Sequence, residues 1–165
     1  ASMRCLIKNG WLNFRMRAML VSFASYQLWL DWRLTSKHLS KYFTDYEPGI
    51  HYSQFQMQSG TTGINTIRIY NPIKQSYGQD PQGECIRKWI PELTDVPDSL
   101  IHEPWRLSPA EELDLGIKSG NNYPSPIVDN GAETKLARDK IWEIRKSKHA
   151  RDLSIDVVNK HASNK

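Results

Sequence analysis

The sequence predicts an all-α domain with short helices and long ordered connections. Apolar residues recur three and four positions apart over residues 12–32, which is the spacing of a helical face. Helix-capping patterns recur later in the chain, and no stretch of useful length alternates apolar and polar residues as a half-buried strand does. With 165 residues, 39% of them hydrophobic and 24% charged, the chain is long enough for one domain with its own core.

The first predicted helix covers residues 12–32 and is apolar on two sides, so we expect it to be buried. A shorter helix follows, with Thr35 as its cap and an end near Asp45. Residues 48–79 show neither the apolar spacing of a helix nor the alternation of a strand, and we expect them to form a long ordered loop. Loops of that length inside a compact domain are usually functional when they are ordered.

Three more helices are predicted from the residues at their ends. Asp80 caps the first, with Pro81 at its first position. Ser108 and Glu111 form a capping box for the second. The third spans residues 131–148, placing a few apolar residues among mixed charges.

Residues 150–165 are expected to form a polar, flexible tail. The net charge of +4 is concentrated near this end, because residues 131–165 hold nine Lys/Arg and five Asp/Glu while residues 1–130 hold 13 of each. A basic end of this kind is more often a solvated helix end than a nucleic-acid-binding arm. Net charge alone therefore does not indicate DNA binding.

Other features narrow the class of protein. No stretch is long and apolar enough for a membrane helix, because Arg15, Arg17 and Asp31 interrupt the best candidate. Cys5 and Cys85 are far apart in sequence and match no zinc-site or disulfide spacing, so we expect no metal and a reducing cytoplasm. The start lacks an initiator methionine and a signal peptide, which leads us to expect a fragment.

Two arginines lie in the most apolar part of the first predicted helix. An arginine in an apolar interior needs an acceptor, because an unpaired buried charge is strongly destabilising. Asp45 is the candidate partner for a structural salt bridge. Alternatively, Asn13 and Arg17 stand four residues apart on one face and form a polar notch in a ligand pocket. The residues alone leave both interpretations open.

Six short segments occur in an order typical of one known family. Residues 10–33 resemble the segment of the photolyase/cryptochrome family that carries an N-R-x-R or related pattern. The other five segments are DYEP at 45–48, RIYNP at 68–72, DPQGECIRKWIPEL at 80–93, HEPW at 102–105 and YPSPIVD at 123–129. The chain thus resembles the C-terminal half of this family's helical FAD-binding domain, with residues 1–149 as the partial domain.

The resemblance implies a cofactor and a reaction. In this family a folded FAD lies at the bottom of a cavity among helices. Repair enzymes bind damaged DNA over that cavity, flip the dimerised pyrimidines into it and donate an electron from excited, reduced flavin. Cryptochrome-like blue-light photoreceptors bind FAD without repairing DNA, and they are the alternative. A helical interaction domain whose arginines form only salt bridges is the non-flavin alternative.

The same resemblance implies that other parts of the protein are missing. The antenna domain, whose pigment the sequence does not identify, and the first half of the flavin domain are absent, so we expect the chain alone to be inactive. The missing helices would normally cover the two-sided apolar helix. Without them, the exposed surface is expected to bind a second copy of the chain.

Site residues follow by position within the matching segments. Arg17 would pair with Asp45 beside the isoalloxazine ring, where the carboxylate can accept from ribityl hydroxyls or a ring N–H. His51 replaces the usual Asn beside flavin N5, either as a proton donor and acceptor or as a hydrogen-bonded spacer. The implied flavin contacts are Arg17, Asp45, Tyr46, Glu47 and His51. The implied residues of the DNA and substrate cavity are Trp11, Phe14, Arg15, Met57, Arg68 and Gln75.

The alternative for Arg15, Arg68 and Gln75 is that they are exposed polar residues with no role in phosphate binding. A lone helical tryptophan such as Trp11 is otherwise most often part of the core.

Several positions depart from the family pattern. Phe14 stands where cyclobutane photolyases usually have an Asn that reaches the lesion. Ala18 replaces a larger contact residue, and Met57 stands in place of a tryptophan that stacks on the dimer. The lesion site is therefore remodelled.

The electron-transfer chain also departs from the pattern. Phe55 replaces the tryptophan nearest the flavin, while Trp32 keeps the middle position. Phenylalanine is much harder to oxidise than tryptophan. We therefore expect the usual path to be broken, or rerouted through Trp29 or a tyrosine such as Tyr52.

Overall fold

The computed structural model describes residues 1–62 and 66–161. All regular elements among these residues are helical, which confirms the predicted all-α class. The α-helices are α1 (Ser2–Asn9), α2 (Phe14–Ser22), α3 (Trp32–Ser40), α4 (Pro48–Gln58), α5 (Pro72–Gln79), α6 (Glu84–Trp89), α7 (Pro109–Asp114), α8 (Asn130–Lys146) and α9 (Lys148–His161). A π-helical turn, η1 (Phe23–Gln27), and two 3-10 turns, η2 (Pro91–Leu93) and η3 (Pro104–Arg106), complete the set.

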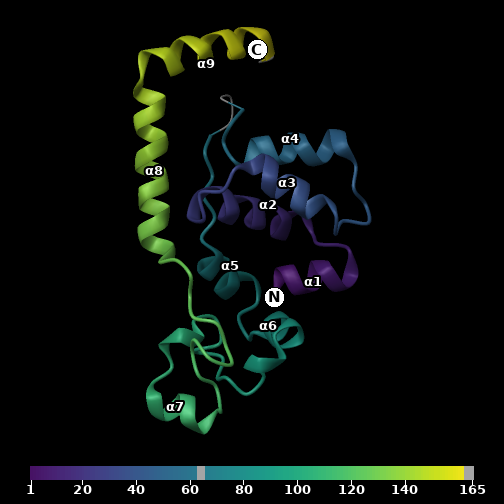
Figure 1. Ribbon diagram of the computed structural model, residues 1–165, viewed down its shortest axis with the longest axis vertical. Coiled ribbons are helices and arrows are strands. Elements are labelled where there is room, and N and C mark those ends of the chain that lie inside the picture. The colour runs from purple at the N-terminus through teal and green to yellow at the C-terminus, as the bar shows by residue number, and fades with distance from the viewer. Residues whose placement is uncertain (63–65, 162–165) are drawn as a thin grey trace.

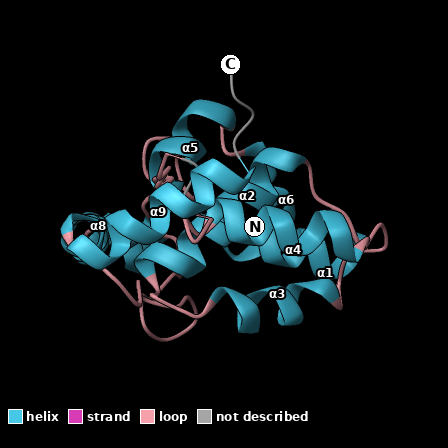
Figure 2. Ribbon diagram, turned by 90° about the horizontal axis from the view of Figure 1, so that it is seen from above, coloured by secondary structure: helices cyan, strands magenta, loops and turns pink. Residues whose placement is uncertain are grey.

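The helices form two groups, each with its own apolar cluster. In Figure 1, α2–α4 lie together in the upper part with α1 just below them, α5 lies at about the height of α1, and α6 and α7 lie lower. The long helix α8 runs along one side, where it contacts η1, and seen from above it lies at the edge of the molecule (Figure 2). The first cluster consists of Leu6, Leu12, Val21, Leu39, Phe43 and Phe55. The second consists of Leu93, Val96, Ile101, Leu107 and Ile117.

The predicted helix over residues 12–32 is wrong in its length. It is divided into α2 and η1, and the chain then leaves the helical conformation at Trp29, whose φ is 51°. Asp31 has an extended backbone, and its side chain accepts a hydrogen bond from the N–H of Arg33 at 2.8 Å. Asp31, rather than Thr35, therefore caps α3, because an aspartate with extended backbone satisfies the free N–H groups of the first turn. The predicted burial is confirmed from Ala24 to Gln27.

The predicted loop over residues 48–79 is also wrong, because it contains two helices. Pro48 and Pro72 each occupy a first helical position, where the missing N–H costs nothing. The Glu47 side chain accepts from the N–H of Ile50, and the Asn71 side chain accepts from the N–H of Lys74. Both helices are therefore specified by their starts, although neither has a clear apolar stripe.

The later helix starts are partly as predicted. Asp80 does cap the next helix, but from outside it: its two carboxylate oxygens accept from the N–H groups of Cys85 and Ile86, both at 3.0 Å. Helix α6 begins at Glu84, so Pro81 is not its first residue. The capping box at the start of α7 is confirmed, with the Ser108 N–H donating to Glu111 at 2.8 Å.

The C-terminal part contains more helix than expected. Helix α8 corresponds to the predicted helix and is capped by Asp129, which accepts from the N–H of Ala132 at 2.7 Å. The expected tail from residue 150 onward is helical as far as His161, and residues 162–165 lie outside the described part. Its exposed apolar side chains, among them Leu153 and Ile155, also make it less polar than its charge count suggests.

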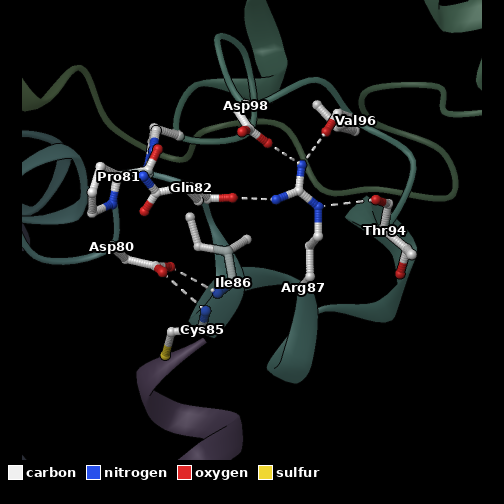
Figure 3. A network of polar contacts seen from close by, with 10 residues as sticks. Asp80, Pro81, Gln82, Cys85, Ile86, Arg87, Thr94, Val96 and Asp98 are labelled. Carbon is white, nitrogen blue, oxygen red and sulfur yellow. Dashed lines mark hydrogen bonds and ion pairs between the residues drawn. The ribbon is translucent and has the colours of Figure 1, made fainter.

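Arg87 holds the loops around the second cluster together (Figure 3). Its guanidinium donates to the backbone carbonyls of Thr94 at 3.0 Å and Val96 at 2.7 Å, and to Gln82. It also pairs with the Asp98 carboxylate at 2.7 Å. One side chain thus satisfies acceptors that lie both before and after α6 in the chain.

A further ion pair joins the two groups of helices and makes a pH-dependent prediction. Arg4 of α1 binds both oxygens of Glu92 at 2.7 Å, and this hydrogen bonding lowers the pKa of Glu92 from 4.5 to about 2. A carboxyl whose pKa is depressed on folding stabilises the fold above its unfolded pKa and loses that contribution as the pH falls.

We therefore expect Glu92→Gln to lower the free energy of unfolding at neutral pH by at most about 1 kcal/mol, since the pair is exposed. The difference from the wild type should shrink as the pH falls from 4.5 to 2, as measured by urea unfolding. A difference that stays constant over this range would show that the ion pair does not contribute.

Candidate functional site

A cavity of about 360 Å³ lies between α2, α3 and α4. Its volume is within the range of small-molecule sites, which is about 300–1,000 Å³. Helix α2 and the residues before it form one wall, the segment at 43–47 forms the edge, and α4 forms the other wall. Of the site residues predicted from the sequence, the cavity is lined by Trp11, Phe14, Arg17, Asp45, Tyr46, Glu47, His51 and Phe55.

Arg17 and Asp45 form an ion pair at the edge of this cavity. The Nη2 of Arg17 donates to the Asp45 Oδ2 at 2.8 Å, and its Nε donates to the Leu12 carbonyl at 2.7 Å. The guanidinium also lies 4.3 Å from the centre of the Phe43 ring. This hydrogen bond from Arg17 lowers the pKa of the Asp45 carboxyl below its ordinary value of 3.8.

Arg17 could be part of a structural salt bridge or of a ligand pocket, and the structure shows both, because its salt bridge with Asp45 also lines the cavity. The pair is less buried than the apolar sequence around it suggests, since the side chains of Arg17 and Asp45 are 28% and 47% exposed. Asn13 does not contribute a free polar group, because its side chain caps α2 by accepting from the N–H of Met16 at 2.9 Å.

His51 is held in place by α3 and surrounded by aromatic rings. Its Nε2 lies 3.0 Å from the Ser36 carbonyl. A carbonyl oxygen only accepts, so Nε2 carries a proton and Nδ1 is the acceptor in the neutral ring. The ring centres of Phe55 and Tyr46 lie 4.5 and 5.1 Å from that of His51. The orientation of His51 is thereby fixed by its neighbours.

Gln54 is a site residue that the sequence did not predict. It lines the cavity, and its Oε1 is buried with no hydrogen-bond partner among the described residues. A buried acceptor of this kind needs a donor, and a flavin offers ring N–H and ribityl hydroxyl donors. The aromatic wall, the cation of Arg17 and this free acceptor therefore fit a flavin. The helical start at Glu47–Pro48 is the signal that would have placed Gln54 on this wall.

The predicted DNA and substrate residues do not all gather in one place. Arg15 donates to Gln75 at 3.4 Å, and both line a separate cavity of about 340 Å³ between α2 and α5. Met57 and Arg68 line neither of these two cavities.

The candidate electron-transfer residues are also dispersed. Phe55 is 4% exposed and belongs to the first apolar cluster, against which Trp32 packs. Trp29 lies elsewhere, with the Lys140 ammonium 4.6 Å from its ring centre.

The described ranges 1–62 and 66–161 contain neither a candidate membrane span nor a candidate metal site. No helix there is long and apolar enough to cross a membrane. No group of three or more His, Cys, Asp or Glu side chains is placed to hold a metal ion there either.

The fold and the cavity define an all-helical domain with an aromatic pocket and one ion pair at its edge. A family described as the FAD binding domain of DNA photolyase matches residues 1–143. The chain belongs to this family, the photolyases and cryptochromes.

Similar proteins include members of both classes. A deoxyribodipyrimidine photo-lyase of Alkalihalophilus pseudofirmus is 38% identical over 139 residues, which is 83% of this chain and 29% of that protein. A cryptochrome DASH of Synechocystis is 34% identical over 145 residues, which is 87% of this chain and 29% of that protein. The crystal structure of a class III photolyase from Agrobacterium tumefaciens superposes with a TM-score of 0.81 at 29% identity, covering 88% of this chain and 31% of that one. The chain thus spans less than a third of the length of these relatives.

Proposed function

We propose that the chain forms the C-terminal half of the flavin-binding domain of a light-driven DNA-repair flavoprotein. In this proposal the whole protein transfers an electron from reduced FAD to UV-damaged pyrimidines. The observation that carries it is the Arg17–Asp45 pair at the edge of a cavity that also contains the unpartnered Gln54 oxygen. A cation favours the anionic reduced ring, and the free acceptor suits a ring or ribityl donor.

The proposal gives each group of site residues a role. Arg17, Asp45, Tyr46, Glu47 and His51 contact the flavin, and they line one cavity. Trp11 and Phe14 also line that cavity and are 54% and 61% exposed, and in this proposal a flipped base enters past them. Damaged DNA is the proposed partner of the whole protein, and the other half of the flavin domain is the proposed partner of this chain.

A cryptochrome-like photoreceptor without repair activity is the second candidate. Phe14, Ala18 and Met57 replace residues that the family's repair enzymes use to contact the lesion. Both Phe14 and Ala18 line the cavity, so the substitutions change its surface directly. Phe55 weakens the usual electron path in either candidate.

The protein that contains this chain should be purified in the dark and its visible absorption recorded. It should then be illuminated with blue light in the presence of an oligonucleotide containing pyrimidine dimers, with the undamaged oligonucleotide and a dark sample as controls. Flavin bands with loss of dimers would establish the repair enzyme, and flavin bands without repair would favour the photoreceptor. A protein that binds no flavin would contradict both.

The electron path gives a separate prediction. Because Phe55 is much harder to oxidise than tryptophan, we expect light-driven flavin reduction to be unchanged by Trp32→Phe. The measurement is the rate of flavin bleaching under blue light with an external reductant. Loss of reduction in the variant would show that the usual route through Trp32 still operates.

Self-association of the 165-residue chain is also expected. Several large apolar side chains are exposed, namely Phe14 at 61% and Ile50 at 65% in the cavity lining, and Leu34 at 71% on α3. Exposed apolar surface of this kind favours association with a second copy. Sedimentation should show oligomers at micromolar concentration, and a clean monomer at all concentrations would contradict this expectation.

A further inference from the structure

The two cysteines of the chain lie on helices that pack against each other. Cys5 is on α1 and Cys85 is on α6, and these two helices are in contact. Both side chains carry free thiols and are partly exposed, so a small oxidant can reach them. Two thiols that are far apart in sequence are thus carried by neighbouring helices.

Contacts on both sides of Cys5 define how α1 lies along α6. One turn before Cys5, the Ala1 carbonyl accepts from the Cys5 N–H at 2.9 Å, and Ala1 lines the cavity of about 340 Å³ together with Cys85. The neighbour of Cys5 in sequence, Arg4, donates to the Trp89 carbonyl at 3.4 Å. Residues four apart on a helix share a face, so Ala1 goes with Cys5 and Trp89 goes with Cys85. Helix α1 therefore follows α6 along the turn that begins at Cys85.

The Cys85 side chain points toward α1. In Figure 3 its sulfur lies away from Arg87, next to the purple ribbon of α1. Burial raises the pKa of the Cys85 thiol, and the negative charges of Asp80 and Cys5 raise it further. The interaction between two charges weakens with their separation, so this influence of Cys5 agrees with the two sulfur atoms facing each other.

We propose that Cys5 and Cys85 are a modification site at which a peroxide forms a reversible disulfide between α1 and α6. Two thiols and one hydrogen peroxide give one disulfide and two waters, so the peroxide takes up the two electrons and both thiol hydrogens. Disulfides that form only on exposure to an oxidant are the kind found in reducing compartments. This cross-link would fix the first group of helices to the second, and it does not depend on flavin binding.

The surroundings of the two sulfur atoms assign the order of the steps. A thiolate is the form that attacks a peroxide, and its raised pKa keeps the Cys85 thiol protonated at neutral pH. Cys5 therefore reacts first, and its sulfur is held by the Asn9 Nδ2, which donates to it at 3.5 Å. The peroxide O–O bond breaks to give a sulfenic acid on Cys5 and one water. The Cys85 sulfur then attacks the Cys5 sulfur, the S–O bond breaks, and the second water leaves.

The test is oxidation of the reduced 165-residue chain by hydrogen peroxide at neutral pH and low micromolar concentration, followed by mass spectrometry. The chain contains only two cysteines, so a disulfide within one chain can only be this one. We expect a monomer that has lost two hydrogen atoms and that dithiothreitol restores. The native chain should form it about tenfold faster than the chain in concentrated urea, where the sulfur atoms meet only by loop closure. Equal rates, or disulfide-linked dimers in place of this monomer, would overturn the proposal.

Two arginine variants test whether the packing of α1 on α6 brings the thiols together. Arg4→Ala removes the contact with Trp89 and should slow cross-linking of the native chain about threefold. Arg33→Ala on α3 is the matched control, because Arg33 is 71% exposed and pairs only with the nearby Asp31, and it should leave the rate unchanged. Circular dichroism checks that both variants are folded. Equal slowing by the two variants would contradict the role of the α1–α6 contact.

Single cysteine variants test the order of the steps. Cys85→Ser should accumulate a sulfenic acid on Cys5, which dimedone traps after peroxide treatment. Cys5→Ser should be labelled about tenfold less, because little of the Cys85 thiol is ionised. Equal labelling of the two variants would overturn the assignment of Cys5 as the thiol that reacts first.

Discussion

Replacement of Arg87 by alanine is expected to lower the free energy of unfolding by about 2–3 kcal/mol, because it removes a partly buried donor from several backbone carbonyls. The guanidinium binds the Asp98 carboxylate and backbone carbonyls that include those of Thr94 and Val96. The Val96 side chain is 1% exposed and belongs to the second apolar cluster. Loss of the guanidinium therefore leaves carbonyls without a donor beside that cluster.

Urea unfolding measures this effect, and two further variants separate its causes. Arg87→Lys keeps the charge but loses the planar fork, so it should recover only a small part of the loss. Arg106→Ala is the matched control, because Arg106 is 64% exposed and pairs with Glu103 at 3.3 Å within one turn. It should change stability by no more than about 0.5 kcal/mol. An Arg87→Ala protein as stable as Arg106→Ala would contradict the role of Arg87 as a structural hub.

Helix starts with strong end signals were predictable, and a helix without an apolar stripe was not. The Ser108–Glu111 capping box satisfies local N–H groups, so the sequence alone identifies it. Helix α4 has no single apolar stripe, because Phe55 packs in the core and also lines the cavity, while Ile50 lines the same cavity and is 65% exposed. Periodicity fails in that case, although Glu47 and Pro48 mark the start.

The interruption near Trp29 was not predictable from periodicity for a different reason. The apolar spacing continues through Leu28 and Trp32, so the pattern is that of one helix. Tertiary packing overrides it, since Trp29 turns toward Lys140 of α8 and Asp31 then caps the next helix. Contacts between residues more than 100 positions apart leave no local signal.

In the candidate site, too, one feature was predictable from the sequence and another was not. The need of a charge in an apolar segment for a partner made Asp45 a candidate, the family resemblance assigned it to Arg17, and the two side chains form an ion pair at 2.8 Å. Gln54 was not predicted, because an isolated glutamine in the sequence gives no indication of burial. Its free oxygen becomes apparent only when α4 is placed against α2.

Replacement of Arg17 by alanine is expected to weaken FAD binding by about a hundredfold, because it leaves the Asp45 charge unpaired at the ligand. Arg17 donates to both Asp45 and the Leu12 carbonyl, so it fixes the cavity edge as well as its charge. Without this donor, the depressed pKa of Asp45 should rise toward its ordinary value of 3.8. The carboxylate stays ionised at neutral pH and would then repel an anionic reduced ring.

The measurement is the FAD content per chain, and the dissociation constants of oxidised and of reduced FAD, for the protein that contains this chain. Arg138→Ala on α8 is the matched control, since Arg138 is exposed and is not among the residues that line the cavity. The double variant Arg17→Ala with Asp45→Ala should bind FAD more tightly than Arg17→Ala alone, because it removes the unpaired charge. A single variant that keeps wild-type affinity would show that the ion pair only braces the fold, and the flavin would then have to be sought at another surface.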